Sequence, residues 1–224
     1  MKKLLKIDLV ILFLSVITSS LLAQEKQDNK LQKSAEVLKE FAAMKETIPQ
    51  QLMEKAEGIV IVPDLIKAGL GIGGQRGKGV AMDKNADGGW SDPVFVTLTG
   101  GSFGFQAGVQ SIDLVMVFTK GSILTSLAKG EFTLGGDVSV AAGPVGRSSS
   151  ASTDTQFDAE VYSYSRSKGL FAGLTINGSK LAADNTANAA FYKSDVTPAS
   201  IFSKNTSSNN SDVVSLKKAV KEFN

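Results

Sequence analysis

The sequence contains no cysteine and no histidine among its 224 residues. Without thiols there is no disulfide, no cysteine-ligated zinc or iron–sulfur site and no cysteine nucleophile. Without imidazole, a serine–histidine–aspartate triad and the commonest transition-metal sites are excluded as well. Enzyme chemistry would have to rest on carboxylates, lysine or a hard metal ion. These absences argue against an enzyme, and no cofactor is expected.

Glycine is absent from both ends of the chain. All 22 glycines lie between Gly58 and Gly178. Glycine is poor in helices and common at turns, bulges and close backbone contacts. We therefore expect a single domain over residues 24–224, with a helical part at 29–57, a β core at 58–178 and a C-terminal segment at 179–224. The expected fold class is α+β: a glycine-rich, curved antiparallel sheet or partial barrel, covered by N-terminal helices and a C-terminal helix.

Residues 1–23 have the pattern of a secretory signal peptide. Lys2, Lys3 and Lys6 precede an apolar stretch that runs to Ala23. That stretch is about fifteen residues long, shorter than the roughly twenty needed to span a bilayer. We expect export to the periplasm or the cell exterior, with an uncleaved anchor as the alternative. Cleavage would remove three basic residues and one acidic residue and leave a formally neutral chain, so a nucleic-acid binder is not expected.

Between Asn29 and Ala56, apolar residues recur at the three- and four-residue spacing of a helix, and Pro49 is expected to divide the segment into two helices. Packing of this apolar face on the sheet is the preferred interpretation. The alternative is an amphipathic helix that inserts into a membrane. Basic and acidic residues are nearly balanced here, however, whereas an interfacial helix for anionic lipid is basic on its polar face.

The glycine-rich segment from Gly69 to Gly79 invites comparison with a phosphate-binding loop. Such a loop needs a glycine five residues before the glycine of its Gly-Lys pair and a hydroxyl residue after the lysine, but Ile72 and Gly79 occupy these places. We expect a glycine-rich hairpin instead. Residues 83–88 match the first half of a calcium loop, but Val94 stands where the closing glutamate belongs, so a turn is preferred.

Several motifs occur in the order and approximate spacing of a known family. They are Trp90-Ser-Asp-Pro93, Gly104-Phe-Gln-Ala-Gly108, Leu134-Gly-Gly-Asp-Val-Ser-Val-Ala-Ala-Gly-Pro-Val-Gly-Arg147 and Tyr162-Ser-Tyr-Ser-Arg-Ser-Lys-Gly-Leu-Phe-Ala-Gly173. In these motifs the chain resembles the SYLF-domain family, from about Ser34 to the region of Tyr192. The resemblance implies a module that binds membrane lipids, phosphoinositides in particular, and fungal members of the family also bind actin filaments.

Basic residues beside glycine or serine are the candidates for binding a lipid headgroup. They are Arg76, Lys78, Arg147, Arg166 and Lys168. Neighbouring backbone amides could also reach an anionic headgroup, and arginine suits bidentate recognition of phosphate. Each basic residue near an anionic membrane contributes about 1 kcal/mol. The alternative is basic charge scattered over the surface.

The sequence thus predicts a non-catalytic module that binds an anionic phospholipid membrane peripherally. The alternative is an exported protein–protein interaction or scaffold protein of the cell envelope, without a lipid ligand. For an exported protein, the sequence argues against actin as a partner. An enzyme that pairs carboxylates such as Asp154, Asp158 and Glu160 has no specific motif behind it.

Overall fold

The computed structural model describes residues 24–44, 48–120, 127, 130–144, 157–167, 170–173, 176–192, 196–203 and 209–222. The N-terminal helix is described over residues 24–42. The other helices are α2 (Gln50–Glu54), α4 (Asn185–Tyr192), α5 (Pro198–Ser203) and α6 (Ser211–Glu222). The strands are β1 (Gly58–Asp83), β2 (Val94–Phe118), β3 (Glu131–Leu134), β4 (Val140–Ala142), β5 (Val161–Ser167), β6 (Leu170–Gly173) and β7 (Ser179–Ala183).

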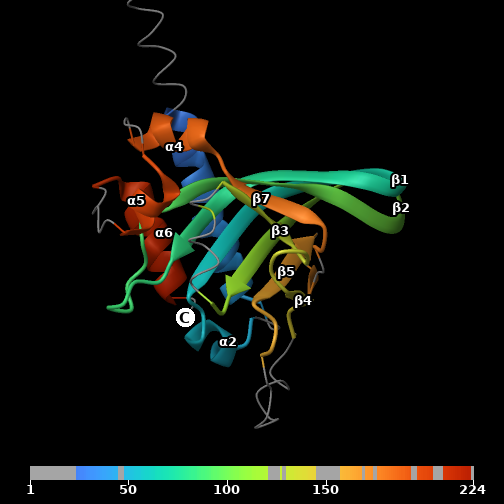
Figure 1. Cartoon of the computed structure of the whole chain (residues 1–224), viewed down its shortest axis with the longest axis horizontal. Helices are drawn as coiled ribbons and strands as arrows, with labels where there is room; N and C mark the ends of the chain where they lie inside the picture. The colour runs from blue at the N-terminus through green and yellow to red at the C-terminus, as the bar shows by residue number, and fades with distance from the viewer. Residues whose placement is uncertain are drawn as a thin grey trace, which may run out of the picture.

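Two long strands, β1 and β2, form the frame of the sheet and pair antiparallel along almost their whole length. Residues 58–62 of β1 pair with residues 114–118 at the end of β2, and residues 75–81 pair with residues 94–100 at its beginning. Between these parts, the two strands project together as a ribbon, to the right in Figure 1. β5, with β4 and β6, extends the sheet beside the end of β2, and β7 and β3 extend it beside the beginning.

Glycines let the two parts of β1 touch and nearly close the curved sheet. A Cβ atom on Gly79 would lie 2.0 Å from the carbonyl oxygen of Ile61, and one on Gly77 would lie 2.5 Å from Cγ1 of Val62. Only glycine fits so close a backbone approach. The predicted α+β class, with a glycine-rich curved sheet covered by helices, is confirmed. The sheet is mixed, because β4 pairs parallel to β5.

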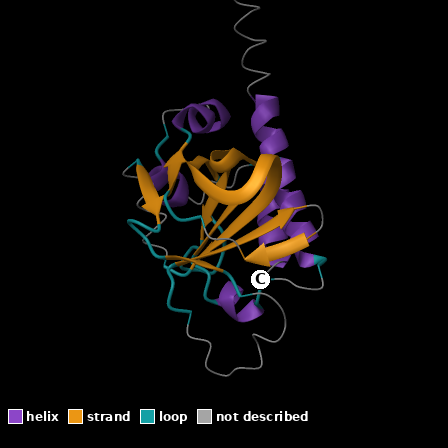
Figure 2. Cartoon of the chain, turned by 90° about the vertical axis from the view of Figure 1, so that its right-hand side faces the viewer, coloured by secondary structure: helices purple, strands orange, loops and turns teal. Residues whose placement is uncertain are grey.

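Both faces of the sheet are covered. One apolar cluster joins the N-terminal helix, α2 and α6 to one face of β1, β2 and β5. Leu31, Leu38 and Phe41 of the N-terminal helix are fully buried in it, and Figure 2 shows this long helix running beside the curved strands. The preferred interpretation, that the helix packs on the sheet, is confirmed. A second cluster joins the other strand face to β3, β7 and α5.

The segment expected to form a glycine-rich hairpin lies inside β1 instead. A Cβ atom on Gly69 would lie 2.4 Å from Cα of Gly73, and the pairing with β2 shifts register between Leu70 and Ile72. The strand therefore bends sharply on itself within these five residues. The prediction of a hairpin was wrong because the glycines allow a bend within one strand, and no turn between two strands is needed.

The Trp90-Ser-Asp-Pro93 motif anchors two helices to the sheet. Asp92 is fully buried, and Nζ of Lys217 in α6 lies 2.6 Å from its carboxylate. The hydroxyl of Tyr192 in α4 donates a hydrogen bond to the carbonyl oxygen of Pro93 at 2.7 Å. The buried carboxylate needs this partner, because an unpaired charge inside a protein is costly. The motif therefore has a structural role in this chain.

The last helix docks as its apolar spacing predicts, with Val213, Leu216 and Val220 buried. Its N-terminus is capped by Asn210, whose Oδ1 accepts hydrogen bonds from the N–H groups of Asp212 and Val213. An asparagine at this place satisfies amides that lack a partner within the helix.

Asp83, at the end of β1, is expected to make stability depend on pH. Burial, followed by the charge of Glu57, raises the pKa of Asp83 to about 6, against an ordinary value of 3.8. The folded state therefore holds the proton more tightly than the unfolded chain, and this contribution is lost as the pH rises through about 6. Asp83→Asn should raise the free energy of unfolding at pH 7 by about 1 kcal/mol, after allowance for solvent screening.

Urea denaturation of the wild type and Asp83→Asn between pH 4 and pH 7 measures this effect. The same substitution at an exposed site, Asp158→Asn, provides a matched control. Equal pH slopes for the wild type and Asp83→Asn would contradict the assignment.

Candidate functional site

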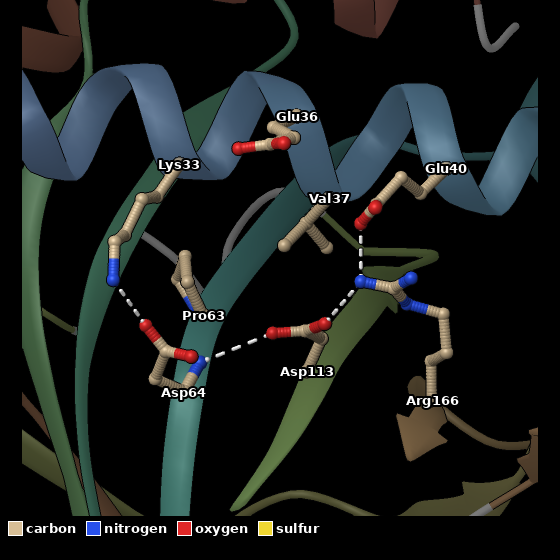
Figure 3. Close-up of a pocket in the computed structure, with 8 residues that line it drawn as sticks. All are labelled: Lys33, Glu36, Val37, Glu40, Pro63, Asp64, Asp113 and Arg166. Atoms are coloured by element: carbon tan, nitrogen blue, oxygen red, sulfur yellow. Dashed lines mark hydrogen bonds and ion pairs between the residues drawn. The ribbon is translucent and has the colours of Figure 1, made fainter. Parts of the chain in front are cut away.

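Arg166, one of the predicted headgroup residues, lies between two carboxylates at the base of the ribbon (Figure 3). Its Nη2 donates hydrogen bonds to Asp113 at 2.5 Å and to Glu40. The side chain is only 19% exposed. Partial burial works against the charged form, but the hydrogen bonds and charges of Asp113 and Glu40 raise the pKa of Arg166. The charge of Arg166 is therefore compensated within the protein.

The pocket around Arg166 is acidic. Lys33 adds a second cation, whose Nζ lies 2.6 Å from the carboxylate of Asp64. The N–H of Asp64 in turn donates to Oδ1 of Asp113 at 3.1 Å. With Glu36 and Glu40, four acidic residues face two basic ones in this pocket (Figure 3). An excess of negative charge repels an anionic headgroup, so this network fits a structural connection from the N-terminal helix to β1, β2 and β5.

Arg76 and Lys78 lie two residues apart on the outer face of β1. Both are exposed, because alternate residues of a strand face opposite ways and Gly77 and Gly79 face inward. The glycines beside these basic residues thus serve the contact within β1. Nζ of Lys78 lies 2.5 Å from the carboxylate of Asp184. Burial would raise the pKa of Asp184, but the hydrogen bond from Lys78 holds it below its usual value.

The structure brings together Arg76 and Lys78 and leaves Arg166 in a separate pocket. Arg76 forms no ion pair with another residue of the described ranges. Arg147 and Lys168 lie outside the described residues, so their roles stay predictions.

A second pocket, not predicted from the sequence, lies where the N-terminal helix, β1, β2 and α4 meet. It is a cavity of about 390 Å³ that combines basic side chains with an apolar wall. Its lining residues are Lys26, Gln27, Lys30, Lys78, Gly79, Phe95, Val96, Asp184, Thr186, Ala187 and Ala190. We call it the lysine pocket.

The lysine pocket carries an excess of positive charge. Lys26 and Lys30 are four residues apart on one helix and so lie on the same face, where like charges repel. Partial burial, followed by the charge of Lys33 and then those of Lys78 and Lys26, lowers the pKa of Lys30. Asp184 is the one acidic residue in the lining. A bound anion would relieve the repulsion and favour the charged form of Lys30. In the sequence, the four-residue spacing of Lys26 and Lys30 was the signal that could have indicated this pocket.

Within the described ranges, no three acidic side chains gather closely enough to hold a metal ion. None of the helices in these ranges combines the length and the apolar character that a membrane crossing requires.

The comparison with known families places the chain. Residues 99–223, more than half of the chain, match the family "Ysc84: Las17-binding protein actin regulator". The chain belongs to the Ysc84 (SYLF-domain) family. The resemblance carried by the motifs is thereby confirmed.

Relatives of this Ysc84-family chain occur in fungi and mammals. Protein YSC84 of Saccharomyces cerevisiae is 35% identical over 184 residues, which make up 78% of this chain and 39% of that protein. SH3 domain-containing YSC84-like protein 1 of Bos taurus is 33% identical over 175 residues, 75% of this chain and 51% of that protein. LAS seventeen-binding protein 3 of S. cerevisiae is 34% identical over 184 residues, which make up 78% of this chain and 40% of that protein. The chain spans about half the length or less of these relatives.

These names correct one prediction about the Ysc84-family chain. The sequence argued against actin as a partner, but the matching family is described as an actin regulator. The two yeast relatives, Protein YSC84 and LAS seventeen-binding protein 3, carry the names that appear in that description. That expectation was wrong. It rested on export of the protein, but a surface that binds a partner is a property of the folded domain and does not depend on a signal peptide. The names describe binding and regulation, which agrees with a protein that is not an enzyme.

Proposed function

We propose that this Ysc84-family chain is a non-catalytic module that binds anionic, phosphate-bearing lipid headgroups at a membrane surface. The observation that carries the proposal is the lysine pocket, in which Lys26, Lys30 and Lys78 face a single carboxylate. A phosphate group supplies the missing negative charge, and lysine binds it as a point charge. The apolar wall formed by Phe95, Val96 and two alanines of α4 suits the less polar part of a lipid.

Neutralising two lysines of the pocket should weaken binding to anionic membranes. Lys26→Gln combined with Lys30→Gln should lower the affinity for vesicles of phosphatidylcholine and phosphatidic acid roughly thirtyfold, since each lysine contributes about 1 kcal/mol. Co-sedimentation at low and high salt, against vesicles of phosphatidylcholine alone, measures the effect. Binding should weaken as the ionic strength rises.

A matched control separates the pocket from general charge attraction. Lys33→Gln with Lys39→Gln removes the same charge from the same helix outside the lysine pocket, and this variant should bind nearly as well as the wild type. Equal losses in the two variants would show that attraction is spread over the helix. Failure of the folded wild type to bind anionic vesicles would refute the proposal.

Binding to actin filaments or to an actin-regulating protein is the second candidate function. The description of the family and the name of the yeast relative LAS seventeen-binding protein 3 favour it. Co-sedimentation of the chain with actin filaments tests it. A variant that lacks the pocket lysines but still pellets with filaments would show that this second surface is independent of the lysine pocket.

Export also stays a proposal. It rests on residues 1–23, which lie outside the described residues.

A further inference from the structure

The β1–β2 ribbon is free of acidic residues. Residues 65–74 of the ribbon contain Lys67, and residues 101–112 contain no charged residue. Arg76 and Lys78 follow where β1 leaves the ribbon, and no aspartate or glutamate lies in residues 65–82 or 94–112. Acidic residues stand only at the base of the ribbon, at Asp64 and beyond. In a chain with nearly equal numbers of acidic and basic residues, this segregation gives the projecting element one sign of charge.

The end of the ribbon is the bend between Gly69 and Gly73. These two glycines touch on the inside of the bend, where a Cβ atom on Gly73 would lie 2.1 Å from the carbonyl oxygen of Ala68. Because side chains alternate along a strand, Leu70 and Ile72 lie on the opposite, outer side. We call residues 69–73, together with residues 107–109 of the paired strand, the apex.

The apex exposes large apolar side chains to solvent. Leu70 is 81% exposed, Ile72 76% and Val109 75%. In the described part of the chain, six large apolar side chains are exposed, and four of them lie on β1 and β2 between residues 66 and 109. Scattered exposed apolar residues are ordinary, but a group at the end of a projecting element marks an interaction site. The helices lie toward the opposite end of the molecule (Figure 1).

We propose that the apex inserts into the acyl-chain region of an anionic lipid bilayer. Strand geometry of about 3.3 Å per residue puts Lys67 and Arg76 roughly 10–13 Å behind Leu70 and Ile72. Half of a bilayer's hydrocarbon core is about 15 Å thick, so the two basic side chains reach headgroup level when the apolar residues enter the core. This inference rests on the proposed membrane binding and adds the element that anchors it.

A single fluorescent label at the apex tests insertion directly. The chain has no cysteine, so Leu70→Cys carries a polarity-sensitive maleimide dye at one place only. With vesicles of phosphatidylcholine and phosphatidic acid, the emission should shift to the blue and be quenched by nitroxides in the acyl chains. Val214→Cys on α6, a site 57% exposed in the wild type, provides the control and should respond to neither.

The outcomes separate insertion from membrane binding in general. Leu70→Ser with Ile72→Ser should lower vesicle affinity about tenfold or more. Inorganic phosphate should still perturb the NMR amide resonances around the lysine pocket equally in this variant and in the wild type. Vesicle binding without a response from the apex dye would overturn insertion and leave the proposed function standing. Absence of vesicle binding altogether would overturn both. A blue shift without lipid that grows with protein concentration would identify the apex as a self-association surface and refute insertion.

Discussion

Gly79→Ala should destabilise the fold by more than about 3 kcal/mol, since its Cβ would collide with backbone and not with a side chain that can rotate away. The new atom would lie 2.0 Å from the carbonyl oxygen of Ile61 and 2.9 Å from Cα of Val62. Relief requires the two parts of β1 to separate, which opens the nearly closed sheet and exposes the apolar cluster inside it. Urea denaturation followed by circular dichroism measures the loss.

Gly101→Ala is the matched control for this experiment. Gly101 lies in β2, and a Cβ atom built on it meets nothing within 4 Å. The same chemical change there should be neutral or slightly stabilising, because alanine restricts the unfolded chain. A Gly79→Ala protein as stable as Gly101→Ala would show that the two parts of β1 do not pack as closely as the structure places them.

Arg166→Met should be the second most damaging change, at about 2 kcal/mol of unfolding free energy. It leaves Asp113, 17% exposed, and Glu40, 42% exposed, facing each other without the cation between them. Removing one partner of a buried ion pair costs more than the pair itself contributes, and the partial exposure of Glu40 reduces that cost. Thermal and urea denaturation measure it.

Lys33→Met removes a cation from the same pocket and serves as the control. The Lys33–Asp64 pair is about half exposed on both sides, so the loss should stay below about 0.5 kcal/mol. Vesicle binding per folded molecule should be unchanged in Arg166→Met, because its guanidinium is held by carboxylates. A selective loss of lipid binding with full stability would instead support the headgroup role predicted from the sequence.

The fold class and the burial of the helices could be read from the sequence because they depend on local composition and periodicity. The confinement of glycine to residues 58–178 marked the β core, and three- and four-residue apolar spacing marked the helices that cover it. The motifs that revealed the family could also be recognised, but their roles could not. Asp92 could be recognised only as part of a motif, because its partner Lys217 lies 125 residues further along the chain.

The candidate binding site depends on contacts that the sequence does not display. Arg76 and Lys78 were predicted because they stand beside glycines, but the structural reason for a glycine at position 79 is its close approach to the distant Ile61. Arg166 looked equivalent to them until Asp113 and Glu40 enclosed it. Lys26 and Lys30 became part of a site only when the N-terminal helix packed beside Lys78.

The sequence by itself determined the fold class and the helical character of the N-terminal segment, and it determined that residues 65–82 and 94–112 carry no acidic residue. Tertiary structure alone decided which cations remain available to a ligand and that Leu70 and Ile72 stand at an exposed apex. The physical reason is that secondary structure and net charge depend on neighbours within a few residues, whereas compensation of a charge and exposure of a side chain depend on groups brought close only by folding.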